Sequence, residues 1–295
     1  ESDGSFLLLP RDYAVVTNVE ADHLEHHGGY EALEEAFEKF VEETRGPVVV
    51  GIDDEGGKKL ASSQNVISLG MDPSAEWRIT ELEEYWTGVS FNLKDPDNHE
   101  LLVKLPIPGL HNAKNAACAA VAGIVAGADS NAVVEALERF GGVARRFEHR
   151  GQIAGVTFVD DYAHLPTEVS ATISAANTGS WSRLISVFQP HRYSRTEALW
   201  RTFQDSFQGT DLLFVTDVYA SGEKARPGIS GALIADAVSL SNPTFEVRYV
   251  PHRSDLIEAL ASELREGDCC LTMGAGDLTS LPDEIQNIMR ESNER

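Results

Sequence analysis

The stretch Val156-Thr157-Phe158-Val159-Asp160-Asp161-Tyr162-Ala163-His164 decides how the second half of this 295-residue sequence is interpreted. Apolar and β-branched residues come first and predict a buried strand over 156–160. Two acids, an aromatic ring and an imidazole follow at once, where the chain is expected to turn. A buried strand that ends in chemically active side chains is typical of a parallel α/β sheet, whose ligands bind beyond the carboxyl ends of its strands.

Strand and helix patterns alternate regularly from this stretch to the end of the chain. Each apolar strand is followed by a helical pattern, which predicts parallel strands joined by crossover helices. We therefore predict an α/β fold with a Rossmann-like, doubly wound parallel sheet in a domain over 145–295. The predicted strands are 156–160, 184–188, 212–216, 245–250 and 269–273, and the predicted helices are 167–176, 196–207, 229–240, 254–266 and one after 280.

The first half mixes strands and helices less regularly, and we assign residues 1–144 to a separate domain. Amphipathic spacing predicts a helix in this half, and an alanine-rich run predicts another. The expected helices are 31–43, 113–126 and 131–140, and the expected strands are 13–19, 48–52, 66–69, 89–93 and 101–105.

The composition excludes several classes of partner. The chain has 24 Lys+Arg and 47 Asp+Glu, a formal charge of −23, which disfavours binding to nucleic acid or to an anionic membrane surface. Its longest apolar run, 116–128, is shorter than the ~20 residues of a membrane span. Three cysteines without a disulfide framework fit a reducing, cytoplasmic setting. We therefore expect a cytoplasmic protein with small-molecule partners.

Cationic side chains follow the second predicted strand of the sheet. His191, Arg192 and Arg195 place up to three positive charges within five residues. The planar fork of arginine suits carboxylate and phosphate oxygens. The alternative is an arginine-rich helix start with exposed ion pairs. The position at a strand end favours an anion-binding site.

Two further strand ends carry candidate ligand contacts. Asp160 and Asp161 would hold a metal, a ribose or a base, or else form a solvated turn and cap the next helix. Gly274-Ala275-Gly276 would let the backbone approach a ligand closely, but the third glycine of the dinucleotide fingerprint is absent.

The first half contributes histidine and amide side chains. His23 and His27 have the i,i+4 spacing of a metal pair, but HExxH is not spelled, so a zinc hydrolase is a minor alternative to a magnesium-type site or a solvated loop. His111 is followed by Asn112 and Asn115, which share a helix face and could contact a purine edge, or Asn112 could simply cap the helix.

These segments, in this order, resemble the Mur ligase family. Taken together they are specific and cover nearly the whole chain, although no single segment would suffice. The matching segments are Glu1-Ser2-Asp3 with Ser5-Phe6, then 17–23, 108–116, Arg145-Arg146-Phe147-Glu148, 160–164, 188–196 and 274–277.

The resemblance implies a three-domain, ATP-dependent amide-bond ligase of peptidoglycan precursor synthesis. It implies that this chain holds part of the central ATPase domain and all of the last domain. No GxxxxGK[ST] phosphate loop occurs in the sequence, so we expect the phosphate loop and the UDP-binding domain to lie upstream, and the 295-residue polypeptide to be inactive alone.

The resemblance also implies substrates and residue roles. UDP-N-acetylmuramate would receive L-alanine through an acyl phosphate, with ATP and Mg²⁺ as cofactors. The alternatives are addition of a whole tripeptide by a related murein ligase, or a non-catalytic nucleotide- or anion-binding module. Glu1 and His23 would hold Mg²⁺; His111, Asn112, Asn115, Arg146, Asp161 and Tyr162 would contact ATP; and His191, Arg192 and Arg195 would be catalytic, binding the reacting carboxylates or phosphate.

One departure from the family pattern concerns residue 165. The family commonly reads Asp-Asp-Tyr-(Gly/Ala)-His-His-Pro, and Leu165 stands where the second histidine is expected. If that imidazole contacts substrate, we expect an altered rate or specificity.

Overall fold

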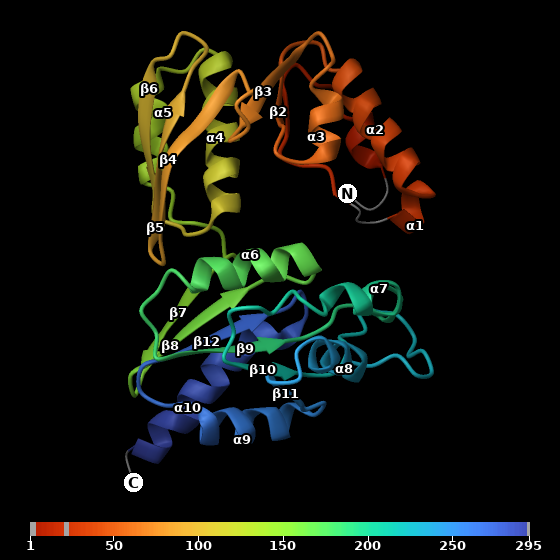
Figure 1. Cartoon of the computed structure of the whole chain (residues 1–295), viewed down its shortest axis with the longest axis vertical. Helices are drawn as coiled ribbons and strands as arrows, with labels where there is room; N and C mark the ends of the chain where they lie inside the picture. The colour runs from red at the N-terminus through yellow and green to blue at the C-terminus, as the bar shows by residue number, and fades with distance from the viewer. Residues whose placement is uncertain (1–3, 21–23, 294–295) are drawn as a thin grey trace. The chain divides into compact units, whose positions relative to one another are not determined.

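The structure is a computed structural model that describes residues 4–20 and 24–293 (Figure 1). Contacts along the chain divide it into two compact units, Glu1–Gly141 and Gly142–Arg295, which are called unit 1 and unit 2 below. Glu1 and His23, the proposed Mg²⁺ ligands, lie outside the described residues.

Unit 2 contains a six-stranded sheet with the order β11-β10-β9-β12-β8-β7. All neighbouring strands are parallel except β7, which pairs antiparallel with β8 at one edge. The predicted parallel sheet is confirmed, and β7 is an added strand that the sequence pattern did not predict. The strands are β7 (Glu148–Ile153), β8 (Val156–Asp161), β9 (Arg183–Phe188), β10 (Leu212–Val215), β11 (Glu246–Tyr249) and β12 (Asp268–Met273).

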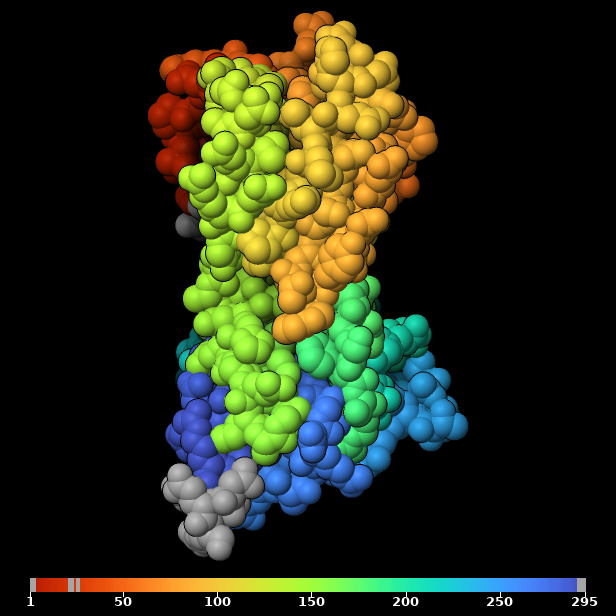
Figure 2. All heavy atoms as spheres, turned by 90° about the vertical axis from the view of Figure 1, so that its left-hand side faces the viewer, coloured from red at the N-terminus to blue at the C-terminus, as the bar shows by residue number. Residues whose placement is uncertain are grey.

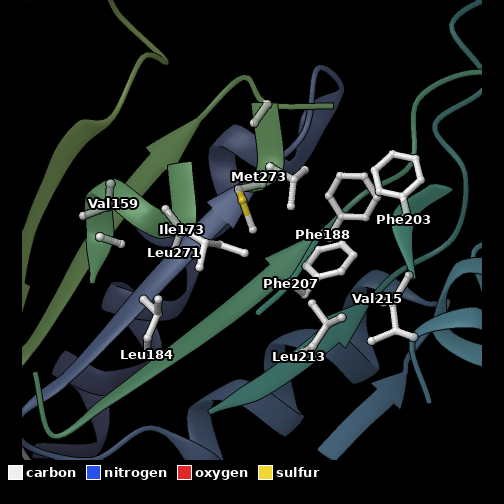
Figure 3. Packing of buried hydrophobic residues seen from close by; sticks show 14 of the residues in the cluster. Val159, Ile173, Leu184, Phe188, Phe203, Phe207, Leu213, Val215, Leu271 and Met273 are labelled. Carbon is white, nitrogen blue, oxygen red and sulfur yellow. The ribbon is translucent and has the colours of Figure 1, made fainter. Parts of the chain in front are cut away.

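Helices cover both faces of this sheet because successive strand residues point to opposite sides. On one face, Val159 and Phe188 pack with α6 (Pro166–Ala176) and α8 (Ala232–Ser241), as Figure 3 shows for the centre of this cluster. On the other face, Phe158 packs against α9 (Arg253–Glu263) and α10 (Leu281–Asn293). The doubly wound arrangement fixes the strands so that their carboxyl ends form one edge.

The segment after β9 differs from the prediction. The expected single helix over 196–207 is a short helix, α7 (Tyr193–Leu199), followed by a 3₁₀ turn, η2 (Trp200–Phe203). The sequence Ser194-Arg195-Thr196-Glu197 has the pattern of a capping box, but none forms, because Arg192 occupies the N-cap position and Ser194 donates its hydroxyl hydrogen bond to Glu223. A contact distant in sequence therefore replaces the local cap.

Unit 1 contains a second six-stranded sheet, ordered β1 to β6 along the chain. Its first four strands pair in parallel, and the β4–β5–β6 part is antiparallel. The strands are β1 (Ala14–Val16), β2 (Val48–Gly51), β3 (Val66–Gly70), β4 (Trp77–Tyr85), β5 (Gly88–Lys94) and β6 (Glu100–Leu105). The hydrophobic pattern of the sequence does not predict β4.

The helices of unit 1 pack through small or apolar faces. Ala113 and Ala117 of the long helix α4 are fully buried, so that its backbone lies close to the sheet. Helix α5 packs along β6, and the two are seen side by side in the space-filling view of Figure 2. The helical segments are η1 (Ser5–Leu8), α1 (Leu24–His27), α2 (Tyr30–Glu42), α3 (Glu55–Leu60), α4 (Leu110–Val125) and α5 (Ser130–Glu138). None of the helices in the described residues has the length and apolar character that crossing a bilayer requires.

Candidate functional site

The candidate site of unit 2 lies at the carboxyl edge of its sheet. Parallel strands β8, β9, β10 and β12 end there, so the segments that follow them meet at one edge. Backbone hydrogen bonds join these segments: Gly274 N–H donates to the Asp161 carbonyl (3.0 Å), and Tyr219 N–H donates to the Pro190 carbonyl (2.9 Å). The sequence-predicted residues 160–164, 191–195 and 274–277 are therefore brought together.

Asp161 fixes the backbone around the site. One carboxylate oxygen accepts the Phe147 N–H and the other accepts the Ala163 N–H, each at 2.7 Å. Burial raises the pKa of Asp161 to about 6 although both hydrogen bonds oppose the shift. The carboxylate thus ties the 145–147 segment to the end of β8, and its predicted contact with ATP stays a prediction.

Asp160 precedes Asp161 in β8, so its side chain lies on the opposite face of the sheet. Its oxygens accept the hydroxyls of Thr272 (2.5 Å) and Thr279 (2.6 Å), and burial raises the pKa of its carboxyl group. Neither aspartate caps the following helix, so that alternative is wrong. Glu168 does so instead, accepting the N–H groups of His164 (2.9 Å) and Leu165 (3.1 Å).

The ring of Tyr162 is close to two arginines. The guanidinium carbon of Arg145 is 4.7 Å from the ring centroid, and that of Arg146 is 5.2 Å away. Arg145 also donates to the carbonyls of Gly274 (2.8 Å) and Gly276 (3.0 Å), whereas Arg146 is half-exposed and 4.0 Å from Glu168. Arg145 therefore holds the glycine-containing loop, and Arg146 is the more accessible cation.

The rings of His164, His191 and Tyr219 form a chain of contacts that begins at Tyr162. His164 lies edge-on to His191 with centroids 5.8 Å apart, and His191 stacks on Tyr219 at 5.8 Å and 13°. Nδ1 of His191 is 3.2 Å from Nη1 of Arg195. Because a guanidinium can only donate, this Nδ1 accepts, and the imidazole is neutral with its proton on Nε2.

Electrostatics agree with a neutral His191. Burial lowers the pKa of His191 to about 4, with further lowering by His164, Arg195 and Arg192. The site therefore holds two arginine cations and a neutral imidazole at pH 7, not three cations as the residue types alone allowed.

Arg192 has an unusual backbone conformation. Its φ is 68°, a region that side chains other than glycine rarely adopt. Its N–H donates to the Tyr219 carbonyl (2.8 Å), and its carbonyl accepts the Thr196 N–H (3.0 Å). Its Nε is buried and has no hydrogen-bond partner among the described residues. An unpaired buried donor on a strained residue is a reason to look for a ligand there.

The glycine at 276 has a packing role. A Cβ at Gly276 would lie 2.4 Å from Oε1 of Gln189 and 2.5 Å from Cγ of Tyr219. The close approach that the sequence suggested is therefore made to Gln189 and Tyr219. Gln189 was not predicted as a site residue; its Nε2 donates to Asp277 (2.8 Å) and its Oε1 is buried without a partner among the described residues.

The predicted nucleotide contacts of unit 1 lie on the first turns of α4. Asn112 is inside the helix, whose N-cap is Gly109, so the capping alternative is wrong; its amide donates to the Pro108 carbonyl at 2.6 Å. Asn115 is exposed and His111 is half-buried. Lys114, between the two asparagines, pairs with Asp53 at 2.8 Å. This pair was missed because its partners are far apart in the sequence.

The structure does not test the histidine metal pair, because His23 lies outside the described residues and His27 ends α1. Among residues 4–20 and 24–293, three potential ligands come together at Asp95, Asp97 and His99, in the turn between β5 and β6. That turn contains none of the predicted ligands.

Two domain families match the sequence. Residues 3–123 match the Mur ligase middle domain, and residues 145–276 match the domain described as Mur ligase, glutamate ligase domain. The chain belongs to the Mur ligase family, and it carries the middle and C-terminal domains of that family.

Two curated relatives share one name. The chain is 42% identical to UDP-N-acetylmuramate–L-alanine ligase of Kineococcus radiotolerans, over 99% of this chain and 63% of the relative. It is 39% identical to the enzyme of that name from Desulforamulus reducens, over 99% of this chain and 64% of the relative. The chain thus spans somewhat less than two thirds of the length of the curated relatives it matches.

Solved structures show the same fold. UDP-N-acetylmuramate-alanine ligase MurC of Thermotoga maritima aligns over 100% of this chain and 63% of its own, with a TM-score of 0.80 and 26% identity. A murein peptide ligase of Psychrobacter arcticus aligns over 96% of this chain and 58% of its own, with a TM-score of 0.66 and 20% identity. The fold class predicted from the sequence is confirmed.

Proposed function

We propose that this chain forms the central and C-terminal parts of an ATP-dependent ligase that joins L-alanine to UDP-N-acetylmuramate. The observation that carries the proposal is the 42% identity to a ligase of that name over 99% of this chain. Both substrates and ATP are cytoplasmic metabolites, so we place the activity in the cytoplasm.

The carboxyl edge of unit 2 supports this proposal by its charge. Arg192 and Arg195 supply two guanidinium groups on a chain with a formal charge of −23, which makes the edge a focused anion site. We assign these two groups to the carboxylate of L-alanine and to the charge that develops during transfer. His191, held by Arg195, would donate a hydrogen bond from Nε2 to the same anion.

The proposed reaction has two steps. The muramate carboxylate attacks the γ-phosphorus of ATP, which gives an acyl phosphate and ADP. The amino group of L-alanine then attacks the acyl carbon, a tetrahedral oxyanion forms, and phosphate leaves as the amide is made. Fixed cations lower the barrier of such a step because they are positioned before the charge appears.

The remaining roles are proposals of the same kind. His111, Asn112 and Asn115 would contact the adenine side of ATP, and Arg146 and Tyr162 would also contact ATP. Asp161 would serve as a positioning residue, since both its oxygens accept backbone N–H groups. Glu1 and His23 would bind Mg²⁺, which when bound neutralises phosphate charge.

The test is an assay of the full-length protein encoded by the gene. We expect amide product, detected by mass, only when UDP-N-acetylmuramate, ATP and L-alanine are all present. Formation of product with the murein tripeptide and not with L-alanine would establish the tripeptide ligase instead. Nucleotide binding without any product would favour the non-catalytic module, and activity that depends on bound zinc without ATP would favour a hydrolase.

A further inference from the structure

Glu223 connects the loop after β10 to the first turn of α7. Its Oε2 accepts the Ser194 N–H at 2.9 Å, and its Oε1 accepts the Ser194 hydroxyl at 2.5 Å. The two residues are 29 positions apart in the chain. One carboxylate thus satisfies both donors of a residue that lies between Arg192 and Arg195.

The Glu223 carboxylate is ionised, which strengthens its hydrogen bonds to Ser194. Burial alone would raise the pKa of Glu223, but the hydrogen bonds from Ser194, together with the charge of Arg226 and the Tyr193 backbone, lower the pKa on balance. The group is therefore ionised at neutral pH, and its hydrogen bonds are charge-assisted. The same loop makes a second tie to α7 through an ion pair between Arg226 and Glu197.

The loop after β10 also holds the backbone of Arg192. The Tyr219 carbonyl accepts the Arg192 N–H at 2.8 Å, and the Tyr219 ring stacks on His191. Arg192 stays at a φ of 68°, and such a conformation persists only where neighbouring contacts enforce it. The contacts that enforce it here come from Tyr219 on one side and from the helix start, fixed by Glu223, on the other.

We propose that Glu223 is a positioning residue for Arg192 and Arg195, an inference that rests on the proposed function. The carboxylate sets the position of the first turn of α7, so that the two guanidinium groups are held ready for the acceptor carboxylate. Glu223 itself does not touch substrate in this account. Its loss would weaken acceptor binding without affecting ATP.

The test compares three variants of the full-length protein. Glu223→Gln keeps an oxygen for the Ser194 hydroxyl but turns an amide N–H toward the Ser194 N–H. Ser194→Ala removes only the hydroxyl bond. Glu258→Gln, at an exposed glutamate of α9, is the matched control. We expect the KM for L-alanine to rise about tenfold in Glu223→Gln and less in Ser194→Ala, with the KM for ATP unchanged.

A double variant separates positioning from a general structural role. If Glu223 acts through Arg192 and Arg195, then Glu223→Gln raises the KM for L-alanine by a smaller factor in the Arg192→Ala background than in the unmodified protein, because one of the two cations that it positions is already gone. Additive effects, or a lower melting temperature with an unchanged KM, would overturn the positioning role. If Arg192→Ala raises the KM and Glu223→Gln does not, only the positioning role is wrong. If Arg192→Ala itself has no effect, the proposed acceptor site is wrong and the inference fails with it.

Discussion

Replacing Asp161 by asparagine should destabilise unit 2, although the two side chains have nearly the same shape. Both carboxylate oxygens of Asp161 accept backbone N–H groups at 2.7 Å, from Phe147 and from Ala163. An asparagine has only one carboxamide oxygen, so its NH₂ must face one of these N–H donors. The site is buried, with Asp161 only 4% exposed, so water cannot replace the lost acceptor.

The expected magnitude follows from one unsatisfied buried donor, which costs ~1–3 kcal/mol. For a domain of about this size, each kcal/mol lowers the melting temperature by ~2–4 °C. A loss of about 2 kcal/mol would therefore lower it by about 4–8 °C. The measurement is thermal and urea unfolding of the 295-residue chain at about pH 5, below the folded-state pKa of about 6, because at higher pH asparagine would also remove the cost of burying a charge.

The neighbouring aspartate provides the control. Asp160 accepts two threonine hydroxyls, and a hydroxyl can rotate to accept from an NH₂ group. Asp160→Asn should therefore cost less than about 1 kcal/mol. If Asp161→Asn unfolds at the same temperature as Asp160→Asn, the proposed role of the two backbone bonds is refuted.

Three further predictions concern other parts of unit 2. Leu165 is buried, so Leu165→His should cost ~1–3 kcal/mol in urea unfolding and leave the KM for L-alanine unchanged; a changed KM would place residue 165 at the substrate. Arg183 forms a bidentate ion pair with buried Asp268, with N–O distances of 3.0 and 2.7 Å. Arg183→Ala should therefore lower the free energy of unfolding by ~3–5 kcal/mol. A loss below about 1 kcal/mol would show that the pair contributes little. The pKa of His191 falls to about 4 in the folded state, so between about pH 6.5 and 4 the unfolded chain binds a proton that the folded chain does not. The free energy of unfolding should therefore decline as pH falls through that window. His191→Gln should remove this part of the pH dependence, and an NMR titration that gives His191 its ordinary pKa would contradict the prediction.

The sheet of unit 2 could be predicted because its four central strands, β8, β9, β10 and β12, are buried and largely apolar. β7 escaped prediction because it is an edge strand with the polar sequence Glu-His-Arg-Gly-Gln-Ile. Helix α3 also escaped prediction, because Gly56 and Gly57 weaken the helical pattern and only the Asp54 cap indicates where the helix starts. Local patterns fail where a segment is stabilised mainly by its neighbours.

The candidate site could be predicted as a set of residue types at strand ends, but not in its internal roles. The sequence places Asp161 beside Tyr162, yet the Phe147 N–H that Asp161 accepts lies 14 positions away. The neutral state of His191 depends on the packing of His164 and Tyr219 around it. Glu223 gave no signal in the sequence, because its partner Ser194 lies on another strand connection.

The central claim is that Arg192 serves an anionic ligand at the carboxyl edge of unit 2, and Arg192→Gly tests it most directly. Glycine adopts a φ of 68° without strain, so this variant should fold with unchanged or slightly raised stability, by up to about 1 kcal/mol. We expect turnover of L-alanine by the full-length protein to fall at least about 100-fold, the loss that removing one transition-state contact commonly causes. Turnover that stays at the level of the unmodified protein, in a variant with normal unfolding, would contradict the account.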